Sequence, residues 1–206
     1  GREPELAPSH HWRSEADDEG RAFCRPRLRG EASRVLWDSL WPYLWQWLSP
    51  RHRMRDPVRC FAAHADGYNL YSLLAKCEKA PEDSPMILAV RARTSDGRLA
   101  VLGAFLPAAL RHTGNRYLDL ATYGQTGCFA ADAYVFSVLG EESSHEPPRA
   151  WYWSGRNELL LHAPQGSEAL IIGGDAVALS LDHSLARGHT AESTSFGSPR
   201  LLPAAG

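Results

Sequence analysis

The chain has 206 residues, of which 44% are hydrophobic and 22% are charged, enough for one domain with a substantial core. Its formal net charge of −2 argues against a nucleic-acid-binding protein, because such proteins usually carry a basic surface. The sequence shows no apolar run of about 18 residues that could span a membrane and no signal peptide. We therefore expect an intracellular, cytoplasmic protein, although an organelle address ahead of Gly1 stays open.

The four cysteines are Cys24, Cys60, Cys77 and Cys128, and none of them forms a CxxC pair. Sparse cysteines in a chain of this length are typical of reduced thiols inside the cell. A zinc site of Cys60, His64 and Cys77 is conceivable, but its spacing matches no common pair of zinc ligands. We therefore expect no metal and no cofactor.

Residues 1–30 are rich in Pro, Gly and charges, which predicts an extended arm or linker, and residues 31–206 are expected to form one domain. A tryptophan-rich helix at 33–48 is predicted to lead into this domain. Its leucines recur every four residues with tryptophans beside them, and Pro42 either kinks the helix or begins a second one. These apolar positions are Leu36, Trp37, Leu40, Trp41, Leu44, Trp45 and Leu48.

Three interpretations compete for this tryptophan-rich helix. Packing against the rest of the domain is favoured over a face that binds a partner protein. A helix lying on a membrane surface is the least favoured, because the stretch lacks a basic polar face. If the helix binds a partner, the interacting residues are expected to be Trp37, Trp41, Leu44, Trp45 and Leu48.

The remaining elements are mostly strands. We expect a strand at 57–64, a helix at 70–80 and a hairpin of strands at 84–93 and 98–106. Gly103, inside the second hairpin strand, marks a bulge or a close backbone approach. Further strands are expected at 133–139, in two pieces within 150–163, and at 168–174 and 176–182. This order predicts an α+β fold, in which two antiparallel β-sheets pack as a sandwich with a few flanking helices.

The glycines in "IIGGDAVALSL" could belong to a phosphate-binding loop or to a turn between strands. A phosphate loop needs a lysine after its last glycine, whereas Asp175 follows Gly174 and no lysine occurs after Lys79. The alternation of Val177, Leu179 and Leu181 is typical of a strand. We therefore predict a hairpin whose turn contains Gly173 and Gly174.

No catalytic motif stands out. A triad of Asp182 with His183 or His189 and Ser193 or Ser195 can be drawn, but such residues occur together by chance in many chains. Trp151 and Trp153 lie on one face of a strand, which is typical of core packing. We therefore expect a protein that is not an enzyme.

Read in order, several stretches resemble the TLDc domain. They are "VRCFAAHADGYNLYSLLAKC", the hairpin ending in "LGAF", "YGQTGCFAADAYVFSV", "YWSGRN" and "LIIGGDAVALSLDHSLARGHTAESTSFGSPRL". The resemblance covers roughly residues 34–201, and its tryptophan-rich opening is most similar to TLDc domains of TBC–TLDc proteins. The matching family positions are Gly103, Tyr123, Gly124, Thr126, Gly127, Gly173, Gly174, Asp182, Gly188 and Phe196.

The sequence also departs from the family pattern. Cys128 stands where the family has a glutamate after Thr-Gly, and Asp132 is the nearest acidic residue. The glycine run is shortened to Gly173 and Gly174. The family's final strand is missing before the end at Gly206, which would leave a sheet edge that something must cover.

The resemblance implies a non-catalytic protein-interaction module, an adaptor or subunit of a larger assembly. The family is linked to resistance to oxidative stress, to regulation of the V-type ATPase and to vesicle traffic, so other proteins are the expected partners. Nucleic acid is not expected as a partner, and a membrane surface is less favoured as a partner than other proteins are. The alternatives are a thiol-based antioxidant protein acting through Cys128, or a structural component of a large complex that has repurposed the fold.

Overall fold

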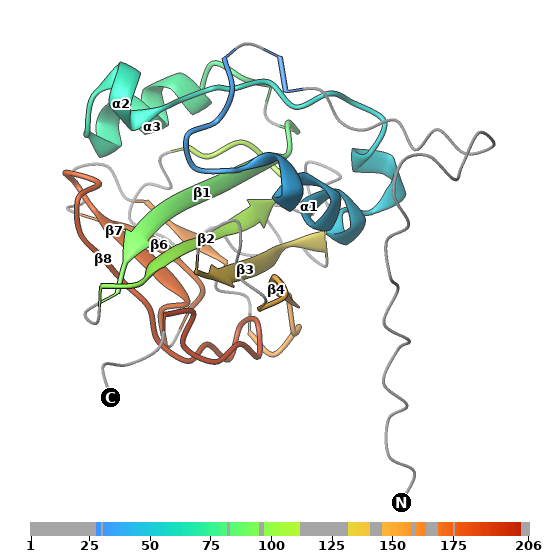
Figure 1. The fold of residues 1–206 in the computed structure, drawn as a ribbon, viewed down its shortest axis with the longest axis vertical. Coiled ribbons are helices and arrows are strands. Elements are labelled where there is room, and N and C mark those ends of the chain that lie inside the picture. The colour runs from blue at the N-terminus through green and yellow to red at the C-terminus, as the bar shows by residue number, and fades with distance from the viewer. Residues whose placement is uncertain are drawn as a thin grey trace, which may run out of the picture.

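The computed structural model describes residues 28–29, 31–81, 83–94, 97–111, 132–140, 146–157, 160–163, 169–174 and 176–202. Within these ranges the chain forms two four-stranded antiparallel sheets and a few short helices (Figure 1). The predicted α+β sandwich is therefore confirmed. The predicted arm at 1–30 lies outside the described residues except for Leu28 and Arg29.

The first sheet has the strand order β1-β2-β3-β4, and every neighbouring pair is antiparallel. The expected hairpin is formed by the first two strands, and its register pairs Ala89 with Gly103 without a bulge. The strands are β1 (Met86–Arg93), β2 (Leu99–Leu106), β3 (Tyr134–Leu139) and β4 (Arg149–Tyr152).

The second sheet has the order β5-β6-β7-β8, again antiparallel throughout. Its central hairpin pairs Ile172 with Leu179, so the glycines lie in the connection between two strands, as predicted. The two pieces expected within 150–163 belong to different sheets, because the chain crosses the sandwich between them. The strands are β5 (Leu161–His162), β6 (Ala169–Ile172), β7 (Leu179–Asp182) and β8 (Gly188–His189).

The main core fills the space between the two sheets. Alternate residues of β2 and the inward residues of β6 and β7 meet there, together with one face of α3 (Leu70–Cys77). Asn69 caps this helix, because its Oδ1 accepts hydrogen bonds from the amides of Tyr71 at 2.8 Å and Ser72 at 3.2 Å. The buried face of the helix consists of Leu70, Leu73, Leu74 and Cys77, as its spacing predicts.

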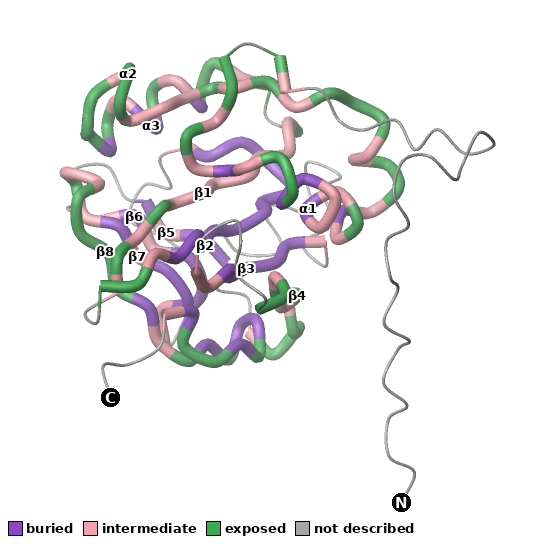
Figure 2. Tube along the Cα trace, viewed as in Figure 1, coloured by how far each residue is buried: buried purple, intermediate pink, exposed green. Residues whose placement is uncertain are grey.

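A second core covers the outer face of the first sheet. The side chains that β2 and β3 turn away from the sandwich are Val101, Phe105, Tyr134, Phe136 and Val138. They pack against a segment that contains η1 (Asp38–Leu40), α1 (Trp41–Trp47) and η2 (Pro50–His52). Both faces of β2 and β3 are therefore buried, which explains their almost uninterrupted apolar sequences (Figure 2).

Two expected elements differ from the structure. The helix predicted at 33–48 begins only at Trp41, because Pro42 occupies the first turn of α1 and a short 3-10 turn precedes it. The strand predicted at 57–64 is wrong. Only Val58 makes an isolated bridge, parallel to Arg29, and α2 (Ala63–Asp66) follows it.

Candidate functional site

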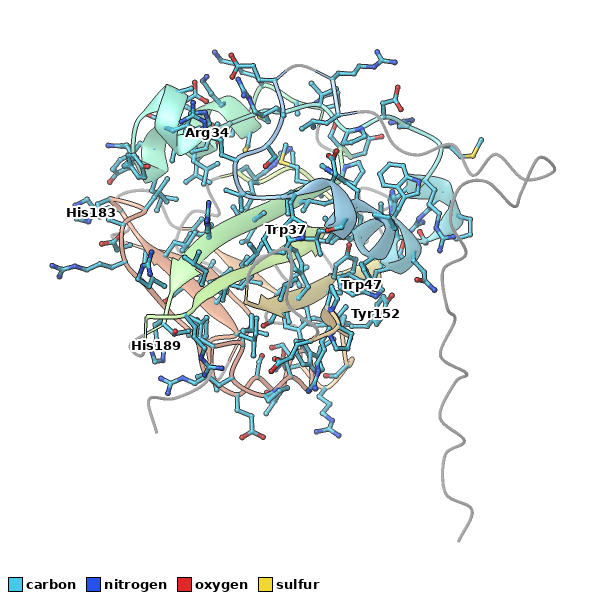
Figure 3. All side chains as sticks on the ribbon, in the orientation of Figure 1. Arg34, Trp37, Trp47, Tyr152, His183 and His189 are labelled. Carbon is cyan, nitrogen blue, oxygen red and sulfur yellow. The ribbon has the colours of Figure 1, made fainter. Side chains whose placement is uncertain are left out.

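The tryptophan-rich segment, residues 36–48, lies over the outer face of the first sheet. Trp41, Leu44 and Leu48 are buried, whereas Trp37 and Trp45 are half-buried (Figure 3 labels Trp37). The favoured interpretation, packing on the domain, agrees with this burial. The role of this segment in binding a partner stays a prediction. Of the five candidate residues, Trp37 and Trp45 are the two with substantial accessible surface.

An aromatic cluster holds this segment against the sheet. The rings of Phe105 and Tyr134 stack with centroids 5.3 Å apart, and Trp47 meets Tyr134 edge-on at 5.9 Å. The Tyr134 hydroxyl donates to the carbonyl oxygen of Leu44 at 3.4 Å, and the Tyr152 hydroxyl donates to that of Trp47 at 3.0 Å. Burial raises the pKa of Tyr134, so its phenol stays protonated and can donate this bond.

Polar side chains that follow this segment bind Asp132, which precedes β3. The carboxylate of Asp132 accepts hydrogen bonds from Ser49 Oγ at 2.9 Å and from Arg51 Nε at 3.0 Å. His52 Nε2 lies 3.3 Å from the same oxygen, and the His52 ring packs on Phe105 with centroids 5.1 Å apart. Ser49 is bonded to the carboxylate rather than to the histidine, and we call the four side chains of Ser49, Arg51, His52 and Asp132 the anchor.

The surroundings of Asp132 and His52 lower the pKa values of both side chains. Burial acts to raise the pKa of Asp132, but the hydrogen bonds from Arg51 and Ser49 outweigh it, and the pKa lies below its ordinary value. For His52, burial and the Arg51 charge lower the pKa, and nearby Asp132 offsets them only partly. A neutral imidazole next to an ionised carboxylate therefore describes the anchor near pH 7.

The connection between β6 and β7 is organised by polar side chains from other parts of the chain. Gly173 has a φ of +84°, a conformation that favours glycine. The Gly174 amide donates to Ser195 Oγ at 2.8 Å, and the Ser195 hydroxyl donates to Asn157 Oδ1 at 3.0 Å. The amide that a phosphate loop would turn toward its ligand is thus used inside the protein.

The Asp–His–Ser triad considered in the sequence analysis is not assembled among the described residues. Asp182 accepts hydrogen bonds from Ser184 Oγ at 2.9 Å and from the amide of Ala186 at 3.2 Å, and so shapes the turn between β7 and β8. His183 and His189 are exposed and lie well apart (Figure 3). Among the described residues, no group of three or more His, Cys, Asp or Glu side chains is arranged to hold a metal ion.

An exposed corner that the sequence did not reveal lies where α3 begins. Tyr68 is 63% exposed and Tyr71 is 45% exposed. The amide of Leu70, between them, donates to the carbonyl oxygen of His183 at 2.8 Å, so the β7–β8 turn lies beside the tyrosines. We call Tyr68, Tyr71 and His183 the exposed corner. The one available signal was that Tyr71 falls off the leucine stripe of the helix.

The sequence matches the TLDc domain family over residues 30–205. The chain belongs to the TLDc family. No curated protein matches the sequence significantly. None of the helices in the described part of this TLDc chain has the length and apolar character needed to cross a membrane.

The TLDc positions that can be located have structural roles. A Cβ on Gly188 would lie 2.7 Å from the carbonyl oxygen of Ser180, so the glycine permits β8 to approach β7. Phe196 is buried and meets Trp153 edge-on, with ring centroids 5.6 Å apart. The positions Tyr123, Gly124, Thr126, Gly127 and Cys128 lie outside the described residues, so their roles stay predictions.

Proposed function

We propose that this TLDc domain is a non-catalytic protein-interaction module, an adaptor or subunit of a larger assembly. The main support for this proposal is the exposed corner. Two neighbouring tyrosines are both exposed by more than two fifths of their surface, so part of each aromatic side chain is accessible to a partner. A tyrosine side chain carries both an apolar ring and a polar group. Tyrosine is enriched at protein interfaces because one side chain supplies both kinds of contact.

The corner is also held rigidly, which reduces the entropy lost on binding. The Asn69 cap fixes the first turn of α3, and the Leu70–His183 hydrogen bond ties that turn to the second sheet. Lys76 and Asp66 form an ion pair that joins α3 to α2. A partner therefore meets a surface that needs little rearrangement.

Membership of the TLDc family supports a first choice of assembly. The family is linked to resistance to oxidative stress, and we propose the V-type ATPase as the partner to test first, with vesicle traffic as the process. The cytoplasm is the compartment in which that contact would take place.

The test begins with affinity purification of the tagged chain from cells, followed by mass spectrometry. A partner recovered reproducibly is then purified and titrated against the chain. We expect the double variant Tyr68→Ser/Tyr71→Ser to weaken binding at least about tenfold, as loss of a central aromatic contact does.

Met54→Ser is the matched control, because Met54 is 84% exposed and lies outside the corner. It should bind as the parent chain does. Equal affinity of the parent and the tyrosine variant would remove the corner from the proposal. A well-folded chain with no reproducible partner would remove the proposed function itself.

A further inference from the structure

Two cysteines that are 17 positions apart in sequence lie side by side. The Sγ atoms of Cys60 and Cys77 are 3.9 Å apart, and both thiols are free. Cys60 is exposed, whereas Cys77 is buried at the end of α3 with 3% of its surface accessible. A disulfide has an S–S length of about 2 Å, so the sulfurs must approach by roughly 2 Å before the bond can form.

The local structure permits this approach from one side. Cys60 lies in an irregular stretch between the bridge at Val58 and the start of α2 at Ala63. Cys77 is held by the core, where Leu73 and Leu74 of the same helix are also buried. The exposed cysteine can therefore move toward a partner that stays in place.

We propose that Cys60 and Cys77 are an oxidation site, at which a hydroperoxide converts the two thiols into a reversible disulfide. This site is separate from the exposed corner and does not depend on the proposed interaction role. It also differs from the Cys128 alternative, because it uses the sulfur atoms of Cys60 and Cys77 and does not involve Cys128.

The reaction balances with hydrogen peroxide as the oxidant. The Cys60 sulfur attacks one peroxide oxygen, the O–O bond breaks, and hydroxide leaves and takes up the thiol proton as water. The Cys77 sulfur then attacks the sulfenic sulfur of Cys60, the S–O bond breaks, and a second water leaves with the Cys77 proton. Two thiols are oxidised by two electrons in total, and one peroxide is reduced to two waters.

The two sulfurs differ in access, which sets their order. Oxidants reach the exposed Cys60 first, since Cys77 is covered by the core. Burial and the neighbouring Cys60 raise the pKa of the Cys77 thiol to about 12. Cys77 therefore stays protonated, which slows its attack, and it gives up its proton to the departing hydroxide as it resolves the sulfenic acid of Cys60.

Peptide mapping tests the pair directly. The full chain is treated with hydrogen peroxide, its remaining thiols are alkylated, and it is digested with trypsin without reduction. Trypsin cleaves after Arg59, Lys76 and Lys79, so Cys60 falls on peptide 60–76 and Cys77 on peptide 77–79. We expect one disulfide-linked species of these two peptides, lost after treatment with dithiothreitol.

Two variants sharpen the result. Cys24→Ser/Cys128→Ser keeps only the proposed pair and should still give the linked peptides. Cys77→Ser removes the resolving thiol, so Cys60 should progress to sulfinic or sulfonic acid. If Cys77→Ser does not fold, the mapping of the parent chain decides. The proposal is overturned if both cysteines remain alkylatable under peroxide, or if Cys60 pairs with Cys24 or Cys128 instead.

Discussion

Gly103 in β2 passes so close to β1 that a Cβ at this position would lie 1.9 Å from the carbonyl oxygen of Leu88 and 2.8 Å from the ring of Phe136. The sequence pointed to a bulge or a close approach at this glycine, and the regular register between the strands identifies the close approach. Because the obstacle is the backbone of β1, a side chain at position 103 forces β1 and β2 apart.

Gly103→Ala is therefore expected to destabilise the protein by about 3 kcal/mol or more, or to prevent folding. The measurement is the free energy of unfolding from urea denaturation. Gly197→Ala is the matched control, because its φ is +58° and no atom lies within 4 Å of the added Cβ. It should cost only about 1–2 kcal/mol from the backbone conformation. Equal losses in the two variants would contradict the close-approach explanation.

Ser195 and Ser193 are both buried but should differ in how much stability they lose when replaced by alanine. Ser195 links the Gly174 amide to Asn157, so Ser195→Ala removes two hydrogen bonds inside the protein and should cost about 1–3 kcal/mol. In the described part of the chain the Ser193 hydroxyl has no hydrogen-bond partner, so Ser193→Ala should be neutral or slightly stabilising. Thermal denaturation of both variants checks the contrast, and a larger loss for Ser193→Ala would refute it.

Leu44 distinguishes core packing from partner binding in the tryptophan-rich segment. Its side chain has no accessible surface, so Leu44→Ala should lower the free energy of unfolding by about 2–5 kcal/mol in the isolated protein. Trp45→Ala, at a half-buried position, should cost clearly less. Gln46→Ala, on the exposed side of the helix, serves as the control. Equal stability of Leu44→Ala and Gln46→Ala would show that the segment does not pack as described.

Acidification should weaken the anchor at His52. Its pKa is lowered in the folded protein by burial and by Arg51, so the unfolded chain binds the proton more tightly. The contribution to stability is complete above about pH 6.5, the ordinary histidine value, and is lost as the pH falls toward the folded pKa. Burial lowers the pKa of His162 as well, so part of the pH dependence belongs to that residue.

The measurement is urea denaturation between about pH 5 and pH 7.5. His52→Gln should flatten the dependence of the unfolding free energy on pH. Loss of packing on Phe105 would shift the whole curve for His52→Gln without altering its slope. An unaltered slope in this variant would therefore assign the pH dependence to other groups.

Periodicity predicted the elements that depend on local pattern. The spacing of Leu70, Leu73 and Leu74 gave α3, and the alternation after Gly174 gave β7, because both signals come from one buried face. The four-residue recurrence from Leu36 to Leu48 identified the buried side chains but not the helix bounds, since tertiary packing buries residues that lie before the helix.

Other features depend on contacts between distant residues and had no local signal. The stretch at 57–64 has the composition of a strand, yet the Asp66 carboxylate accepts a hydrogen bond from the amide of Ala62 at 2.8 Å and favours a helical turn. The crossing of the chain from β4 to β5 depends on which sheet each strand joins. The contact between Cys60 and Cys77 required the path of the chain around α3.

The shared strands β2 and β3 have a thermodynamic consequence. Side chains such as Leu102 and Phe105 point in opposite directions from one backbone and serve two separate cores. Displacing the tryptophan-rich segment would expose the outer core and loosen the strands that also support the inner one. The two layers should therefore melt in a single cooperative transition, and an assembly that recruits this domain would bind a preformed body instead of a segment that folds on contact.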